Sequence, residues 1–237
     1  MVEYALYIES GPRRKTTMVH VLDLLGCIAQ GPTTEAALEA TSEAVRSYLR
    51  FLHGHGEGVD LSAPFSTKVV EHVMEGVWLG YGDPTPGFSF DFQALSADEL
   101  EVYIQRLTWI QADLLELIQG VPRDQWTSEP AGGGRPLVGI LEHLGESHAY
   151  YLRYQVGKVE GLSEALRAMQ RGAQDPSTAL GQLWQVSNAR LRAMTEAERQ
   201  AQVPHGQVTW TARRGLRRML EHTWEHYQEI AARLEKA

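Results

Sequence analysis

Residues 96–120, SADELEVYIQRLTWIQADLLELIQG, mark the point at which a helical pattern takes over the sequence. Ser96 followed by Glu99 is the capping-box pattern that starts a helix. Apolar side chains then recur every three to four residues as far as Ile118, and Gly120 provides a stop. This period predicts an amphipathic helix that buries one face against other helices.

Three further segments of the C-terminal half show the same period. We predict helices over Leu137 to about Val156, Ser177 to Thr195 and Thr211 to about Lys236, with a short helical turn near Leu162 to Met169. Four amphipathic helices of this length are the ingredients of a four-helix bundle.

The N-terminal part has the two-residue period of strands. The predicted elements are, in chain order, a strand in EYALYIE (3–9), a turn in SGPRRK (10–15), a strand in 16–27, a helix from about Glu35 to Leu52 with Thr33 or Thr34 as N-cap, and a strand in FSTKVVEHVM (65–74). A Gly- and Pro-rich segment, Gly80 to Phe92, suits a domain boundary. We therefore expect an α+β protein with a β-β-α-β module over residues 1–80, a linker over 81–95 and an all-α bundle over 96–237.

The composition of the chain argues against several classes of protein. The chain has 237 residues, 43% of them hydrophobic, and a net charge of -8. An acidic surface is a poor match to nucleic acid, because phosphate binding needs basic groups. The single cysteine, Cys27, allows no intrachain disulfide, and the first residues lack the pattern of a signal peptide. We expect a cytoplasmic protein without a membrane span.

Two histidines in HTWEH, His222 and His226, lie four residues apart in the last predicted helix. At about 100° per residue they are about 40° apart, on the flank of the buried stripe, so both imidazoles can reach one cation. This spacing also occurs by chance on surface helices. A metal site therefore needs a third ligand from another helix.

The segment EHLGESH, residues 142–148, offers that ligand on the second helix of the C-terminal half. His143 falls on the flank of the apolar stripe and His148 near its centre. Helical geometry leaves both open, because His148 could equally be a hydrogen-bonded core histidine.

The two segments EHLGESH and HTWEHYQEI resemble those of the DinB/YfiT-like superfamily of four-helix bundles with a three-histidine metal site. Carried over by position, the resemblance implies that His143, His222 and His226 are ligands and that His148 is not. It implies a divalent metal ion, zinc or nickel first and iron as a third candidate. It also implies a low-molecular-weight thiol as cosubstrate. The loop GGGRP, residues 132–136, lacks the tryptophan often found there in the superfamily.

A second resemblance lies in GCIAQGPTTEAALEATSEAVRSYL, residues 26–49, which is similar to the HicB-like antitoxin fold. It covers about residues 3–75, with Leu25-Gly26-Cys27 where Pro-Gly-Cys is usual. In that family the module binds a protein partner. A DNA-binding element usually follows it, whereas here the predicted bundle takes that place, so we do not infer an antitoxin.

Other polar residues carry weaker signals. Glu146, Glu225 and Glu229 could orient an imidazole, but we expect them to be solvated helix glutamates. RRGLRR, residues 213–218, is expected to form a solvated basic face. Cys27 is expected to be a small buried residue, and catalytic and cofactor-binding residues stay unknown.

Two functions follow from these patterns. The first is a divalent-metal-dependent protein, a thiol-dependent transferase or a hydrolase, that uses the three-histidine site. The alternative is a non-catalytic interaction or regulatory protein that binds its partner through the HicB-like module. A homodimer is compatible with either function.

Overall fold

The computed structural model describes residues 1–12, 15–83, 85–130, 133–171 and 174–235. It divides into two compact units, Met1–Gln93 with Pro204–Thr209 and Ala94–Val203 with Trp210–Ala237. In the part of the chain described, no helix is long and apolar enough to cross a membrane. The mixture of a strand-rich first unit and a helical second unit confirms the α+β class.

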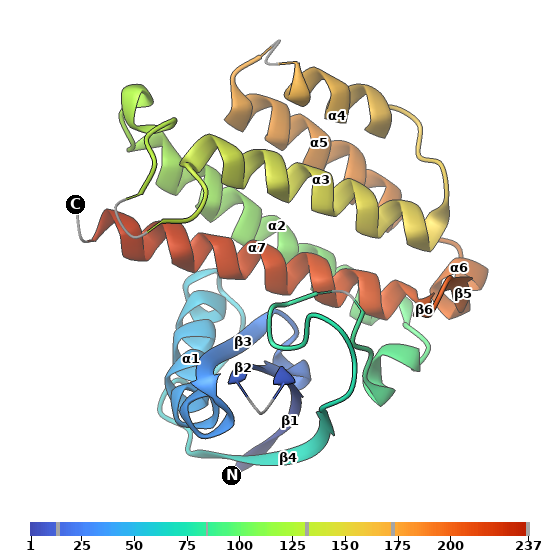
Figure 1. Ribbon diagram of the computed structural model, residues 1–237. Helices are drawn as coiled ribbons and strands as arrows, with labels where there is room; N and C mark the ends of the chain where they lie inside the picture. The colour runs from blue at the N-terminus through green and yellow to red at the C-terminus, as the bar shows by residue number, and fades with distance from the viewer. Residues whose placement is uncertain (13–14, 84, 131–132, 172–173, 236–237) are drawn as a thin grey trace. The chain divides into compact units, whose positions relative to one another are not determined.

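A mixed β-sheet forms the first unit, together with one long helix (Figure 1). Its elements are β1 (Val2–Ser10), β2 (Lys15–Val21), β3 (Cys27–Thr33), α1 (Thr34–Gly54) and β4 (Phe65–Val73). Within the described residues the sheet order is β3-β2-β1-β4. β1 pairs antiparallel with β2 and parallel with β4, because the chain returns through α1 before it forms β4.

The sequence predicted one strand between the first strand and the helix, where the structure has two, β2 and β3. The apolar run 16–27 is broken by a 3-10 turn at Leu22–Leu24, and a further strand, β3, follows it. The order is therefore β-β-β-α-β, where the sequence predicted β-β-α-β. Arg13 and Arg14 of the predicted turn lie outside the described residues.

Gly26 explains why the chain can turn back into β3. Its φ is +110°, and an added Cβ would lie 2.4 Å from the hydroxyl oxygen of Tyr48. That hydroxyl donates a hydrogen bond of 2.7 Å to the carbonyl of Leu25. A residue without a side chain is needed here, both for the left-handed backbone and for the close approach of α1.

Helix α1 starts and packs as its sequence predicts. Thr33 is the N-cap, and its side chain accepts a hydrogen bond of 3.2 Å from the backbone of Ala36. The apolar face of the helix contacts β2 and β3, and Cys27 at the start of β3 is buried. The predicted small buried role of Cys27 is confirmed.

Helices dominate the second unit. They are α2 (Ala97–Gln119), α3 (Leu137–Val156), α4 (Leu162–Gln170), α5 (Pro176–Arg192), α6 (Glu196–Gln200) and α7 (Ala212–Leu234). The Ser96–Glu99 capping box is present, and the predicted bounds of the second helix, α3, are confirmed. The predicted end of the last helix at Lys236 lies outside the described residues. A short hairpin, β5 (Val203–His205) and β6 (Val208–Trp210), had no counterpart in the prediction.

The four long helices pack in a ring in which α2 contacts α7 and α5, and α3 contacts the same two (Figure 1). Gly215 of α7 permits a close approach to α3, since a Cβ there would overlap the Gln155 amide. A buried hydrogen bond of 2.7 Å from Asn188 to Gln111 links α5 to α2. This ring fixes the rotation of α3 and α7 about their axes, and hence the direction of their histidines.

The basic segment 213–218 is not a solvated face. Its four arginines are at most 3% exposed. Arg213 is bonded to Glu99, and Arg217 and Arg218 both bond to the buried Glu221 at 3.0 and 2.7 Å. The expectation was wrong because Glu99 and Glu221 pair with three of the arginines, and Arg214 lies over the Trp210 ring with 5.6 Å to its centroid.

Candidate metal centre

Two adjacent turns of α7 carry His222 and His226, and α3 carries His143. The apolar stripe of α7 packs into the helix ring, so that its flank faces α3. His222 and His226 are 7% and 8% exposed, and His143 is partly exposed. The site is therefore largely desolvated and is open on the side of His143.

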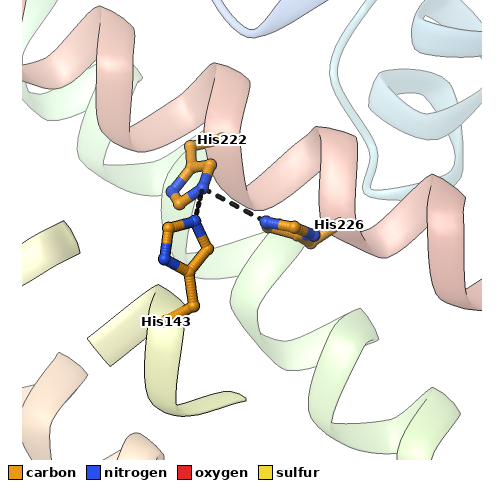
Figure 2. A group of neighbouring side chains, drawn as sticks. All are labelled: His143, His222 and His226. Carbon is orange, nitrogen blue, oxygen red and sulfur yellow. Dashed lines mark hydrogen bonds between the residues drawn. The ribbon is translucent and has the colours of Figure 1, made fainter. Parts of the chain in front are cut away.

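The three rings converge through their Nε2 atoms (Figure 2). Nε2 of His222 lies 3.0 Å from Nε2 of His143 and 3.2 Å from Nε2 of His226. One ligand atom from each ring lies within 4.8 Å of the other two. Three imidazoles from two helices thus point at a common position.

His148 lies in a different environment. It is fully buried, and its Nε2 lies 3.0 Å from the hydroxyl of Thr223. That hydroxyl donates to the carbonyl of Met219 at 2.7 Å, so it accepts the hydrogen bond from the His148 ring. The structure groups His143, and not His148, with the two histidines of α7.

Burial controls the charge of the site. Desolvation lowers the pKa of His143 to about 4, and the nearby Arg135 guanidinium acts in the same direction. Desolvation also lowers the pKa of His222 well below its usual value, with further contributions from His226 and Arg218. Both rings are consequently neutral at pH 7, which is the form that coordinates a metal.

One acidic residue is bonded directly to the cluster. Oε2 of Glu229 lies 2.7 Å from Nδ1 of His226, while Oε1 is paired with Arg233. The hydrogen bond from His226 holds the pKa of the Glu229 carboxyl below its usual value. The expectation of a purely solvated Glu229 was wrong. Glu146 is exposed, and it accepts a hydrogen bond from Gln170 and not from a histidine of the cluster.

Hydrogen bonding alone cannot satisfy this arrangement of rings. Because the ionised Glu229 carboxylate only accepts, Nδ1 of His226 donates to it, and a ring with one hydrogen then has its lone pair on Nε2. A single ring hydrogen on Nε2 of His222 can be directed at one of its two short contacts, at 3.0 and 3.2 Å, but not at both.

A shared cation fits the same three atoms. At zinc–nitrogen distances of about 2.0–2.1 Å, two ligands of a tetrahedral ion lie about 3.3 Å apart. Two of the three separations, 3.0 and 3.2 Å, are close to that value, and all three lie within 4.8 Å. The donor set therefore fits a divalent ion that prefers imidazole, and three protein ligands leave coordination positions open.

Aromatic side chains lie beside the cluster on α3 and at the end of β6. The ring centroid of Tyr151 is 6.2 Å from that of His222 and 5.8 Å from that of Trp210. Tyr154 stacks on Trp210 with centroids 5.7 Å apart. Of these rings, Tyr151 packs against His222 on one flank of the site, a contact that no sequence motif indicated.

The family comparison agrees with this geometry. A family model described as the DinB superfamily matches residues 106–230, which contain all three histidines. The match spans more than half of the 237 residues, and the chain belongs to the DinB superfamily. Domains of this superfamily are in general metal-binding. Searches of curated proteins and of solved structures found no match.

Proposed function

We propose that His143, His222 and His226 hold one divalent cation and that the chain is a metal-dependent thiol-linked transferase or a hydrolase. The convergence of three Nε2 atoms from α3 and α7 is the observation that carries this proposal. A bound zinc or nickel ion would supply Lewis acidity and lower the pKa of a water or thiol at an open position. Iron is the third candidate.

The surrounding residues define what the chain itself contributes. The neutral His143 and His222 bring no charge to the site, and Glu229 orients His226. Tyr151 lies against the His222 ring and is itself backed by Trp210. The exposed Arg135 guanidinium adds positive charge near His143, which favours a thiol that carries an anionic group.

Metal analysis tests the proposal. We expect about one equivalent of zinc or nickel in the wild type after loading and dialysis, and strong losses in His143→Ala, His222→Ala and His226→Ala. His53→Ala, an exposed residue of the other unit, is the matched control. Equal metal content in all variants would reject the site. Thiol-transfer assays with and without chelator then test catalysis.

The finer assignment of the fold is part of the same proposal. We infer that residues 96–237 form a DinB-type four-helix bundle, supported by the ring of α2, α7, α3 and α5. We also infer that residues 1–80 form a HicB-like module joined through residues 81–95. The turn at Gly26, strand β3 and the start of α1 at Thr34 support this module. A cytoplasmic location and a homodimer remain proposals from the sequence.

A second candidate function is a non-catalytic partner-binding protein. Large apolar side chains after β4 are exposed in the first unit, namely Val77 (60%), Trp78 (69%) and Tyr81 (65%). Such a patch is typical of a protein interaction surface. Loss of a captured partner from the full chain on Trp78→Ser and Tyr81→Ser would support this function. Turnover that a chelator abolishes would count against it.

A further inference from the structure

The hydrogen bond between Glu229 and His226 determines which ring nitrogen of His226 is free. Glu229 lies three residues after His226 on α7, so its carboxylate reaches Nδ1 at 2.7 Å. A carboxylate accepts and cannot donate, and a neutral imidazole has a single N–H group. Nδ1 of His226 therefore carries a hydrogen. In the form of the ring that binds a metal, which has one hydrogen, the lone pair of Nε2 faces His222 at 3.2 Å.

The neighbouring histidine lacks such a partner. Nδ1 of His222 is buried and, in the described part of the chain, has no hydrogen-bond partner. Among the residues that the structure describes, no carboxylate plays the part of Glu229 for that ring. A hydrogen bond on Nδ1 therefore selects Nε2 as the coordinating nitrogen of His226, whereas no such bond selects the coordinating nitrogen of His222.

Arg233 extends the contact from α7 to the segment before α3. It is paired with Oε1 of Glu229, and its Nη1 donates a hydrogen bond of 2.8 Å to the carbonyl of Arg135. The adjacent Gly134 has a φ of +101°, and a Cβ there would lie 3.1 Å from Nη2 of Arg233. Since Arg135 precedes α3, which bears His143, the network connects the two helices that supply the histidines.

We propose that Glu229 is a positioning residue of the three-histidine site, which fixes His226 with its hydrogen on Nδ1 and its Nε2 free, and that Arg233 holds the Glu229 carboxylate in this orientation. The consequence for metal binding rests on the proposed function. The position of the ring hydrogen does not, because it is a property of the metal-free protein.

Glu229→Gln provides a sharp test because it changes the chemistry and keeps the shape. Arg233 can bond only to the carbonyl oxygen of the new amide, so the NH₂ group is turned toward Nδ1 of His226. Nδ1 must then accept, and the ring hydrogen moves to Nε2. We expect this tautomer change in the ¹⁵N NMR spectrum of the metal-free protein, and an affinity for Zn²⁺ about 10- to 100-fold weaker.

Two further variants separate positioning from general damage. Glu146→Gln is the matched control, because its carboxylate is bonded to Gln170 and not to a histidine of the cluster. Glu229→Gln combined with Arg233→Met should restore the wild-type tautomer, since the amide is then free to turn its oxygen toward His226. Thermal unfolding of each metal-free variant verifies that it is folded.

The outcomes are distinct. An unchanged His226 tautomer and unchanged Zn²⁺ affinity in folded Glu229→Gln would overturn the proposal. Failure of Arg233→Met to restore the tautomer would overturn the role of Arg233. If the wild type binds no Zn²⁺ although Glu229→Gln shifts the tautomer, the proposed function fails and the control of His226 by Glu229 is supported.

Discussion

The buried His148 makes the stability of the helical unit sensitive to acid. The size of this effect on the free energy of unfolding follows from the pKa of His148. Burial lowers the pKa of His148 from 6.5 to about 3. Between these values the unfolded chain binds a proton that the folded protein excludes, so stability falls as the pH falls. The contribution is fully present above about pH 6.5. From about pH 7.5 to about pH 5, His148 should account for a loss of about 2 kcal/mol.

Urea unfolding at several pH values, followed by tryptophan fluorescence, measures this loss. Trp184 is a suitable reporter because its ring centroid lies 5.8 Å from that of His148. His148→Gln should flatten the pH dependence by about 2 kcal/mol over that interval, whereas His53→Gln, an exposed control, should leave it unchanged. His143 and His222 act in the same direction and remain in every variant. Equal pH slopes for wild type and His148→Gln would refute the reasoning.

Three other predictions concern the first unit, the start of α2 and the site. Gly26→Ala should lower the free energy of unfolding by about 1–3 kcal/mol because of its positive φ and the contact with Tyr48. In urea unfolding, the loss caused by Gly26→Ala should be smaller when Tyr48 is already replaced by Phe. Additive losses would contradict the contact. Ser96→Ala should cost about 1 kcal/mol through loss of the N-cap, measured in the same way, and no change would show that the cap is solvated instead. Zinc at about 100 times its Kd should stabilise the wild type by about 2.7 kcal/mol in thermal unfolding, and His222→Ala should abolish most of that gain. Equal stabilisation of the variant would place the ion elsewhere.

The helices of the C-terminal half could be predicted well because their signals are local. Ser96, Glu99 and Gly120 define the ends of α2, and the stripe of α3 gave its bounds, Leu137–Val156. The third strand of the first unit was missed for a local reason too. The short 3-10 turn at Leu22–Leu24 keeps the apolar pattern of a strand while it changes the direction of the chain.

The candidate site was predicted in part. The i, i+4 spacing brings His222 and His226 together on any helix, so the sequence was sufficient for that pair. Helical geometry left the choice between His143 and His148 open, because both lie near the same face of α3, and the resemblance to the DinB/YfiT-like superfamily favoured His143. Glu229 was predicted to be a solvated glutamate. Its i, i+3 spacing from His226 and its i, i+4 spacing to Arg233 already indicated the two contacts that it makes.

By itself, the sequence determined the helical periods and the histidine pair, since each depends on neighbours a few residues away. Only the tertiary structure showed that the His143 ring lies beside those of His222 and His226 and that His148 bonds to Thr223. It also decided that Arg217 and Arg218 are buried around Glu221. The reason is that the rotation of a helix about its axis is fixed by its partners. A small rotation of the helix about its axis would move a side chain from solvent into the shared site.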